Sequence, residues 1–150
     1  MSSANDFLIL AGRDFKLCEK VEEDFPDEYA VSAASYHIQQ AVEKLLKGLI
    51  LLHGEELQFT HNITKLALKC EDLGVSLPEC LDDVTEVLTQ WETTNRYDPF
   101  VAFSEKKYGK ARQAYHELRR TLEELIEEIE KQSEEETKEE SQTEEPGLTM

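Results

Sequence analysis

The sequence predicts an all-α protein, folded as an antiparallel up-and-down bundle of about five helices. Three observations support this prediction. Apolar residues recur at steps of three and four in five segments, glycines and prolines separate those segments, and no segment shows the two-residue alternation of a half-buried strand. With 150 residues the chain fits one domain, long enough to bury roughly 70% of the surface that its unfolded form would expose.

The longest predicted helix covers residues 27–52 and lies at the centre of the bundle. Its apolar residues share one face, which we expect to be core: Val31, Ala34, Ile38, Ala41, Leu45, Leu49 and Leu52. At about 100° per residue, His37, Gln40, Lys44 and Lys47 fall together in a polar stripe away from that face. Gly54 then ends the helix, as a glycine just past the last periodic residue commonly does.

A shorter helix precedes this central one, and two follow it. The first ends before Pro26, and its inner face consists of Leu8, Ala11, Phe15 and Cys18. The third is capped by Thr60 or Asn62 and closed by Gly74, with inward residues Ile63, Leu66, Ala67, Cys70 and Leu73. The fourth has Ser76 and Pro78 in its first turn and frays near residues 93–95. Its apolar face consists of Leu77, Leu81, Val84, Leu88 and Trp91.

The last predicted helix follows a bend over residues 96–102, where Pro99 biases Asp98 away from helical dihedrals. Its apolar seam ends near Gln132 and consists of Tyr108, Ala111, Tyr115, Leu118, Leu122, Leu125 and Ile129. The first half of this helix is basic and the second half acidic, which opposes the helix dipole. A basic patch continuous with Arg96, antiparallel pairing of two such helices in a dimer, or chance composition would each account for this arrangement.

The net charge of −17 is unevenly distributed along the chain. Residues 133–150 have no helical apolar period and contribute −6, so we expect a disordered acidic tail after a helical domain over residues 1–132. The domain alone still carries −11. Because phosphates attract clustered lysines and arginines, this balance argues against broad, unassisted binding to a nucleic-acid backbone.

The sequence predicts a cytoplasmic protein without a cofactor or a metal. No apolar run follows a basic N-terminal start, and no stretch approaches the roughly 20 apolar residues of a membrane span. Cys18, Cys70 and Cys80 are odd in number and widely spaced, which is typical of reduced thiols. His37, His53, His61 and His116 lie too far apart in sequence for a local metal-ligand spacing.

The usual catalytic motifs of hydrolases, nucleotide-binding loops and zinc proteases are absent from the sequence. The polar stripe of the central helix has two interpretations. It could form a cationic, hydrogen-bonding wall suited to a phosphate or a nucleotide. Alternatively, it is a solvated helix face in which Glu43 and Lys47 pair at four residues' distance, and the residue pattern alone favours this second interpretation.

A longer pattern in the same helix resembles a known family. The segment Tyr36-His37-Ile38-Gln39-Gln40-Ala41-Val42-Glu43-Lys44-Leu45-Leu46-Lys47-Gly48-Leu49 is similar to the helix-two signature of the HEPN family, the higher-eukaryote and prokaryote nucleotide-binding domains. Further matching pieces follow in order: Thr60-His61-Asn62-Ile63 with Leu66, Leu77-Pro78, and Thr94-Asn95-Arg96-Tyr97 with Asp98-Pro99. The resemblance spans about residues 5–132.

The resemblance implies a bundle of four or five helices that is frequently dimeric. Members of the family are often encoded or fused beside minimal nucleotidyltransferases, and many act in toxin–antitoxin, defence or RNA-processing settings. A catalytic branch cleaves RNA without metal, using an Arg followed by a His after four to six intervening residues.

This sequence departs from the catalytic pattern. Arg96 occupies the Arg position, but Val101, Ala102 and Phe103 stand where the His is required. Without that His, no group near Arg96 is suited to general acid–base catalysis near neutral pH. Arg112 and His116 have only three intervening residues, and they lie further along the last helix than the motif should.

We therefore expect a non-catalytic, homodimeric HEPN-like module that binds a nucleotide, a nucleic-acid phosphate or a nucleotidyltransferase partner. Its candidate ligand-binding residues are His37, Gln40, Lys44, Lys47 and Arg96. One alternative is a metal-independent, toxin-like endoribonuclease with an unconventional site. Another is a purely structural dimerisation or antitoxin-like module, in which the seam of the last helix matters and the polar stripe does not.

Overall fold

The computed structural model describes residues 3–24, 27–97 and 105–144, with side chains described except at 27–32, 92–97 and 140–144. It contains six helices in those ranges and no strand: α1 (Ala4–Asp24), α2 (Asp27–Leu52), α3 (Ile63–Asp72), α4 (Glu79–Asp82), α5 (Thr85–Tyr97) and α6 (Glu105–Glu144). The all-α bundle is confirmed. None of the described helices is both long and apolar enough to cross a membrane.

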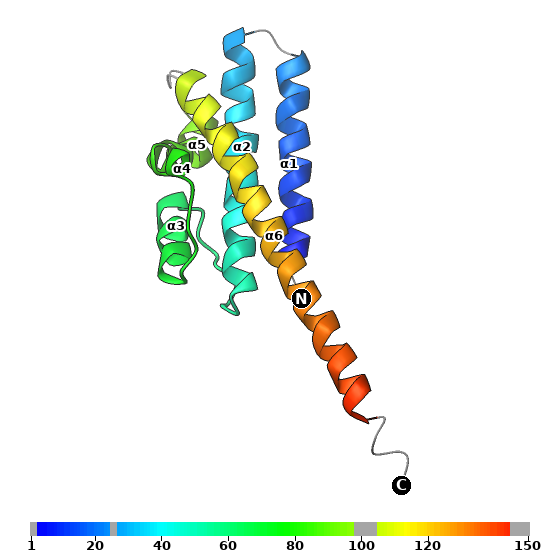
Figure 1. Cartoon of the computed structure of the whole chain (residues 1–150). Coiled ribbons are helices and arrows are strands. Elements are labelled where there is room, and N and C mark those ends of the chain that lie inside the picture. Colours follow the sequence, from blue (N-terminus) through cyan, green and yellow to red (C-terminus); the bar gives the residue numbers. More distant parts are fainter. Residues whose placement is uncertain (1–2, 25–26, 98–104, 145–150) are drawn as a thin grey trace.

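Helix α2 lies at the centre of the bundle. Figure 1 shows α1 and α2 side by side as an antiparallel pair, with α6 crossing them obliquely and α3 to α5 on the other side of α2. Helix α2 contacts α1, α3, α5 and α6. Four neighbours around one helix leave little of its circumference open to solvent, and this decides the environment of its polar stripe.

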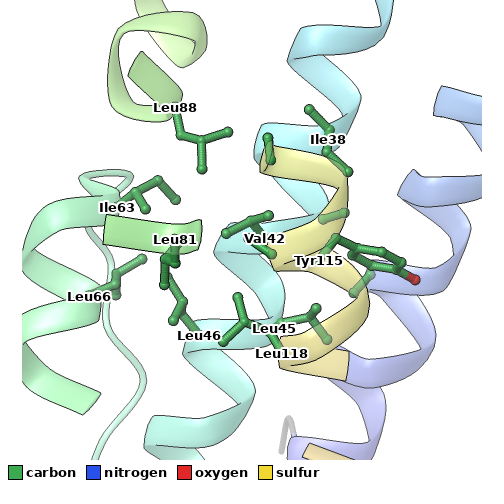
Figure 2. Packing of buried hydrophobic residues seen from close by; sticks show 14 of the residues in the cluster. Ile38, Val42, Leu45, Leu46, Ile63, Leu66, Leu81, Leu88, Tyr115 and Leu118 are labelled. Carbon is green, nitrogen blue, oxygen red and sulfur yellow. The ribbon is translucent and has the colours of Figure 1, made fainter. Parts of the chain in front are cut away.

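The core consists mainly of residues at the predicted helical spacings. From α2, Ala34, Ile38, Ala41, Leu45 and Leu49 are completely buried, as predicted for the core face. Leu52 is half-buried, and the side chain of Val31 lies outside the described residues. Figure 2 shows Ile38, Val42, Leu45 and Leu46 of α2 facing Ile63 and Leu66 of α3, Leu81 of α4, Leu88 of α5, and Tyr115 and Leu118 of α6. The apolar face of α2 is therefore wider than the predicted seam, because it meets helices on more than one side.

Helix α3 runs in the same direction as α2. His61, just before α3, lies against Glu43, while Cys70 near its end lies against the backbone of Leu46. Gly54 ends α2 with a φ of 82°, and Gly74 follows α3 with a φ of 87°, so both glycines end helices as predicted, in the left-handed region that glycine favours. The segment between Gly54 and Asn62 carries the chain back along α2.

The predicted fourth helix is divided into α4 and α5 by a turn at Asp83 and Val84. Two adjacent aspartates and two β-branched residues make residues 82–85 a poor helical segment, and Lys110 of α6 binds the Asp83 carboxylate at 2.9 Å. Helix α5 continues to Tyr97, past the predicted fraying at 93–95. The rest of the predicted bend, residues 98–102, lies outside the described residues.

Helix α1 ends before Pro26 as predicted, whereas α6 is longer than predicted. A reciprocal cap starts α1: the backbone N–H of Ser3 donates to the Asp6 carboxylate at 3.0 Å, and the backbone N–H of Asp6 donates to the Ser3 hydroxyl at 3.2 Å. Helix α6 continues to Glu144, so its predicted end near Gln132 is wrong. Glutamate and lysine are good helix formers even without an apolar face. The division into a domain and a tail at residue 132 stays a prediction.

The N-cap of α3 provides a test of local stability. The Asn62 side-chain oxygen accepts a hydrogen bond from the backbone N–H of Lys65 at 3.0 Å. We expect Asn62→Ala to lower the free energy of unfolding by about 1 kcal/mol, because that N–H loses its intramolecular partner. Urea denaturation followed by circular dichroism measures the change. Asn62→Asp keeps the acceptor and should match the wild type; equal losses in both variants would contradict the capping role.

Candidate functional site

The structure separates the four members of the α2 stripe into different environments. Lys47 is buried, with 8% of its surface exposed, and His37, Gln40 and Lys44 are half-buried. Arg96 lies in the last turn of α5, and its side chain is outside the described set. The stripe is therefore not an open cationic face along the helix.

Glu43 is the centre of a buried polar network. Its carboxylate, in a residue only 3% exposed, accepts hydrogen bonds from Gln39 at 3.1 Å and from Lys47 at 3.3 Å. His61 Nδ1 lies 3.0 and 3.2 Å from the two carboxylate oxygens, and because a carboxylate only accepts, this nitrogen carries the hydrogen. Gln40 extends this hydrogen-bond network by donating to the side-chain oxygen of Gln39 at 2.7 Å.

Lys44 is not part of this network and forms a salt bridge with Asp14 of α1. The Lys44 and Asp14 side chains are 23% and 14% exposed, so the pair joins α1 to α2 at a site partly shielded from solvent. The two lysines of the stripe are thus each paired with an acid inside the bundle. The predicted Glu43–Lys47 pair exists, but it is buried, and the expectation of a solvated face is wrong because other helices cover α2.

His37 retains an unused polar atom. Its Nδ1 is buried and has no hydrogen-bond partner in the described part of the structure, while its ring meets the Tyr36 ring edge-on with centroids 5.6 Å apart. A buried polar atom without a partner is energetically unfavourable, so it is a place where a ligand or a water could bind. His37 and Gln40 are the stripe residues that the bundle itself uses least.

The structure also adds residues that sequence reasoning missed. Gln39, Glu43 and Asp14 contact stripe residues and His61 contacts Glu43, yet only Glu43 was assigned a partner from the sequence, through its spacing from Lys47. Gln39 lies four residues before Glu43, so its contact could have been inferred from helical spacing. His61 and Asp14 belong to other segments, and no sequence pattern places them there.

Arg112 and His116, the alternative catalytic pair, point toward α1. Arg112 Nη1 donates to both carboxylate oxygens of Glu22, at 2.8 and 2.7 Å, and Tyr108 also hydrogen-bonds that carboxylate. The His116 ring is exposed and meets the Phe15 ring edge-on at 4.9 Å. Arg112 is thus held by a structural ion pair, which leaves its guanidinium less available to a substrate.

The three cysteines are free thiols. Among the described residues, no three His, Cys, Asp or Glu side chains are grouped so as to hold a metal ion. Burial is the main cause that raises the pKa of Cys18 to about 11 and the pKa of Cys70 to about 12. For Cys80, burial and then the hydrogen bond and charge of Glu117 raise the pKa to about 12.

These shifts predict slow alkylation of the native protein. A raised pKa keeps a thiol protonated, so at pH 8 roughly one Cys18 in a thousand is the reactive thiolate. We expect Glu117→Gln to lower the pKa of Cys80 and to speed its alkylation by iodoacetamide roughly threefold to tenfold. Mass spectrometry of peptides measures the rate, with Cys18 and Cys70 in the same sample as controls. An unchanged Cys80 rate would contradict the assigned effect of Glu117.

Comparison with known proteins gives one result. A family model described as HEPN domain matches residues 4–132, which includes all of α1 to α5 and most of α6. No curated protein and no solved structure is significantly similar to the chain.

Proposed function

The chain belongs to the HEPN domain family, and from this premise we propose that it is a non-catalytic binding module for a nucleotide, a nucleic-acid phosphate or a nucleotidyltransferase partner. The observation that carries the proposal is the sequence after Arg96. Val101, Ala102 and Phe103 replace the His that the ribonuclease branch requires. Metal-independent cleavage of RNA needs a general acid or base at that position, and these three side chains supply none.

The polar side of α2 supports the binding role. His37 offers a buried ring nitrogen without a hydrogen-bond partner among the described residues, and Gln40 is half-buried. The Lys44 side chain is 23% exposed. These groups provide hydrogen-bond donors of the kind that phosphates and nucleotide bases accept. Lys47 contributes mainly by holding Glu43, and Arg96 remains a candidate at the end of α5.

Calorimetric titration with a panel of mononucleotides tests this site. The informative variant combines Asp14→Asn with Lys44→Gln. It removes the positive charge of Lys44 without leaving the Asp14 carboxylate unpaired against α2. We expect it to bind more weakly than wild type, while Lys65→Gln, an exposed change on α3, binds equally well. No binding by wild type to any nucleotide, with no nucleotidyltransferase partner bound either, would refute the proposal.

The ribonuclease alternative makes a different prediction. Purified protein incubated with mixed RNA should leave it intact, because Arg112 is engaged by Glu22 and no His follows Arg96 at the required spacing. Cleavage that disappears in Arg96→Ala or His116→Ala would overturn the non-catalytic assignment. Cleavage that persists in both variants would indicate a contaminating nuclease.

We further propose that the module acts as a homodimer, as HEPN domains often do, in a toxin–antitoxin or related setting. Light scattering coupled to gel filtration measures the mass in solution, and a monomer at all concentrations would contradict the dimer. If Lys44 can be neutralised together with Asp14 without any effect on nucleotide or partner binding, the purely structural dimerisation module becomes the better description.

A further inference from the structure

A groove lies between α1 and α6, apart from the α2 stripe. Its volume is about 290 Å³, and it is lined by Gly12, Phe15, Lys16, Glu19, Tyr115, His116 and Arg119. Three of these residues carry or can carry positive charge, in a chain whose net charge is −17. Cations gathered in a concave site on an acidic protein raise the local concentration of small anions.

Two of the three basic side chains have no polar partner among the described residues. Lys16 and His116 are exposed, and neither makes a hydrogen bond or an ion pair within the described ranges. The His116 ring is held only by edge contacts to the Phe15 and Tyr115 rings, at 4.9 and 5.2 Å. A ring N–H of His116 and the Lys16 ammonium are therefore available as hydrogen-bond donors from opposite walls.

The third basic group, the Arg119 guanidinium, is held in place by hydrogen bonds within α6. Its Nη1 donates to the Tyr115 hydroxyl at 2.9 Å and its Nε donates to Glu123 at 2.7 Å, so Nη2 is the nitrogen without an assigned partner. A Cβ atom at residue 12 would lie 2.9 Å from Arg119 Nη1. Gly12 thus lets the guanidinium lie directly against α1, where any other residue would displace it.

The floor of the groove is rigid. The Phe15 and Tyr115 rings stack with centroids 4.2 Å apart and an angle of 9° between planes, which joins α1 to α6 beneath the basic groups. Preorganised donors on a rigid floor lose little entropy on binding. Glu19 is the acid in the lining, and it lies one helical turn from Lys16.

We propose that this groove binds a small phosphate monoester, with Lys16, His116 and Arg119 contacting the phosphate group. The volume is close to the lower end of about 300 Å³ for small-molecule pockets, which suits a phosphate with a small substituent. Three convergent donors match a doubly charged tetrahedral anion better than a singly charged planar carboxylate. The chain's negative charge disfavours a nucleic-acid strand as the ligand.

The experiment is a titration of the ¹⁵N-labelled full chain with inorganic phosphate and with ribose 5-phosphate, followed by NMR at constant ionic strength maintained with chloride. Saturable shifts are expected at the amides of Gly12 and His116. Lys16→Gln should weaken binding about tenfold, as expected for one charge-assisted hydrogen bond. Glu19→Gln removes the opposing charge and should strengthen binding at least twofold, a gain that damage to the fold cannot mimic.

Two controls separate a built site from general attraction. Lys20→Gln removes one positive charge a turn further along α1, outside the lining, and should bind within twofold of wild type. Gly12→Ala changes no charge but displaces Arg119, and should weaken binding severalfold. Absence of saturable shifts, equal losses in Lys20→Gln and Lys16→Gln, or wild-type binding by Gly12→Ala would each overturn the proposal.

The same titration distinguishes this inference from the proposed function. Shifts caused by a short RNA oligomer, and not by ribose 5-phosphate, would show that the ligand class is wrong. Nucleotide binding that depends on Lys44 and not on Lys16 would support the α2 site, and absence of Lys16-dependent binding of ribose 5-phosphate would refute the groove. Binding of ribose 5-phosphate that depends on Lys16 and not on Lys44 would support the groove, whatever the outcome at α2.

Discussion

Glu43→Gln is expected to lower the free energy of unfolding by about 3 kcal/mol, one of the two largest effects that the structure predicts. The substitution preserves shape but removes the negative charge that Lys47, with 8% of its surface exposed, contacts at 3.3 Å. A lysine left buried without its carboxylate retains the desolvation penalty and loses the compensating attraction. Urea denaturation monitored by circular dichroism measures the loss.

A double-mutant cycle identifies the source of that loss. Glu43→Gln combined with Lys47→Met removes both charges, and the new amide oxygen can still accept from Gln39. Replacing a buried ion pair with neutral groups of similar size is often close to neutral in stability. We therefore expect the double variant to be more stable than Glu43→Gln alone by about 2 kcal/mol. A double variant that is no more stable would show that the charge pair is not responsible.

The second large effect concerns the packing of α3 on α2. Leu66 faces the α2 core residues (Figure 2) and is 1% exposed. Leu68, two residues further along the same short helix, is 55% exposed. Leu66→Ala should lower the free energy of unfolding by about 2–5 kcal/mol, through lost apolar contact and the cavity that remains. Chemical denaturation at one temperature is sufficient to measure it.

Leu68→Ala is the matched control, since it makes the same chemical change in the same helix. Its expected effect is within about 0.5 kcal/mol of wild type, because the side chain is already mostly in water. If both substitutions destabilise equally, α3 contributes through its helical propensity and not through packing. If neither does, the placement of α3 against α2 is incorrect.

Much of the fold could be predicted because it depends on local spacing. Apolar residues three and four apart must share a face of any helix they form, so Ile38, Leu45 and Leu49 were predicted to be core and are completely buried. The predicted bounds of α2 are those observed, and Gly54 adopts the positive φ that ends it. The family signature lies on the same helix, and the family itself is confirmed by the match over residues 4–132.

The predicted helix ends differ from the observed ones at two places, because apolar spacing does not determine where a helix ends. The seam Leu81, Val84, Leu88 and Trp91 stays buried although a turn divides α4 from α5, because a turn of two residues keeps those side chains on the inner side. Beyond Gln132 no apolar period continues, yet α6 does, since glutamate-rich segments have high helical propensity without a buried face. An apolar pattern therefore locates a packed helix better than it locates that helix's ends.

By itself, the sequence determined the helical class, the core face of α2 and the missing His after Arg96, because each depends on residues close together in the chain. Only the tertiary structure decided that Lys44 pairs with Asp14 of α1, that His61 binds Glu43, and that Lys16 lies beside His116 and Arg119. Helical spacing determines which face a side chain occupies. It does not determine which other helix covers that face, since this depends on how all the helices pack together.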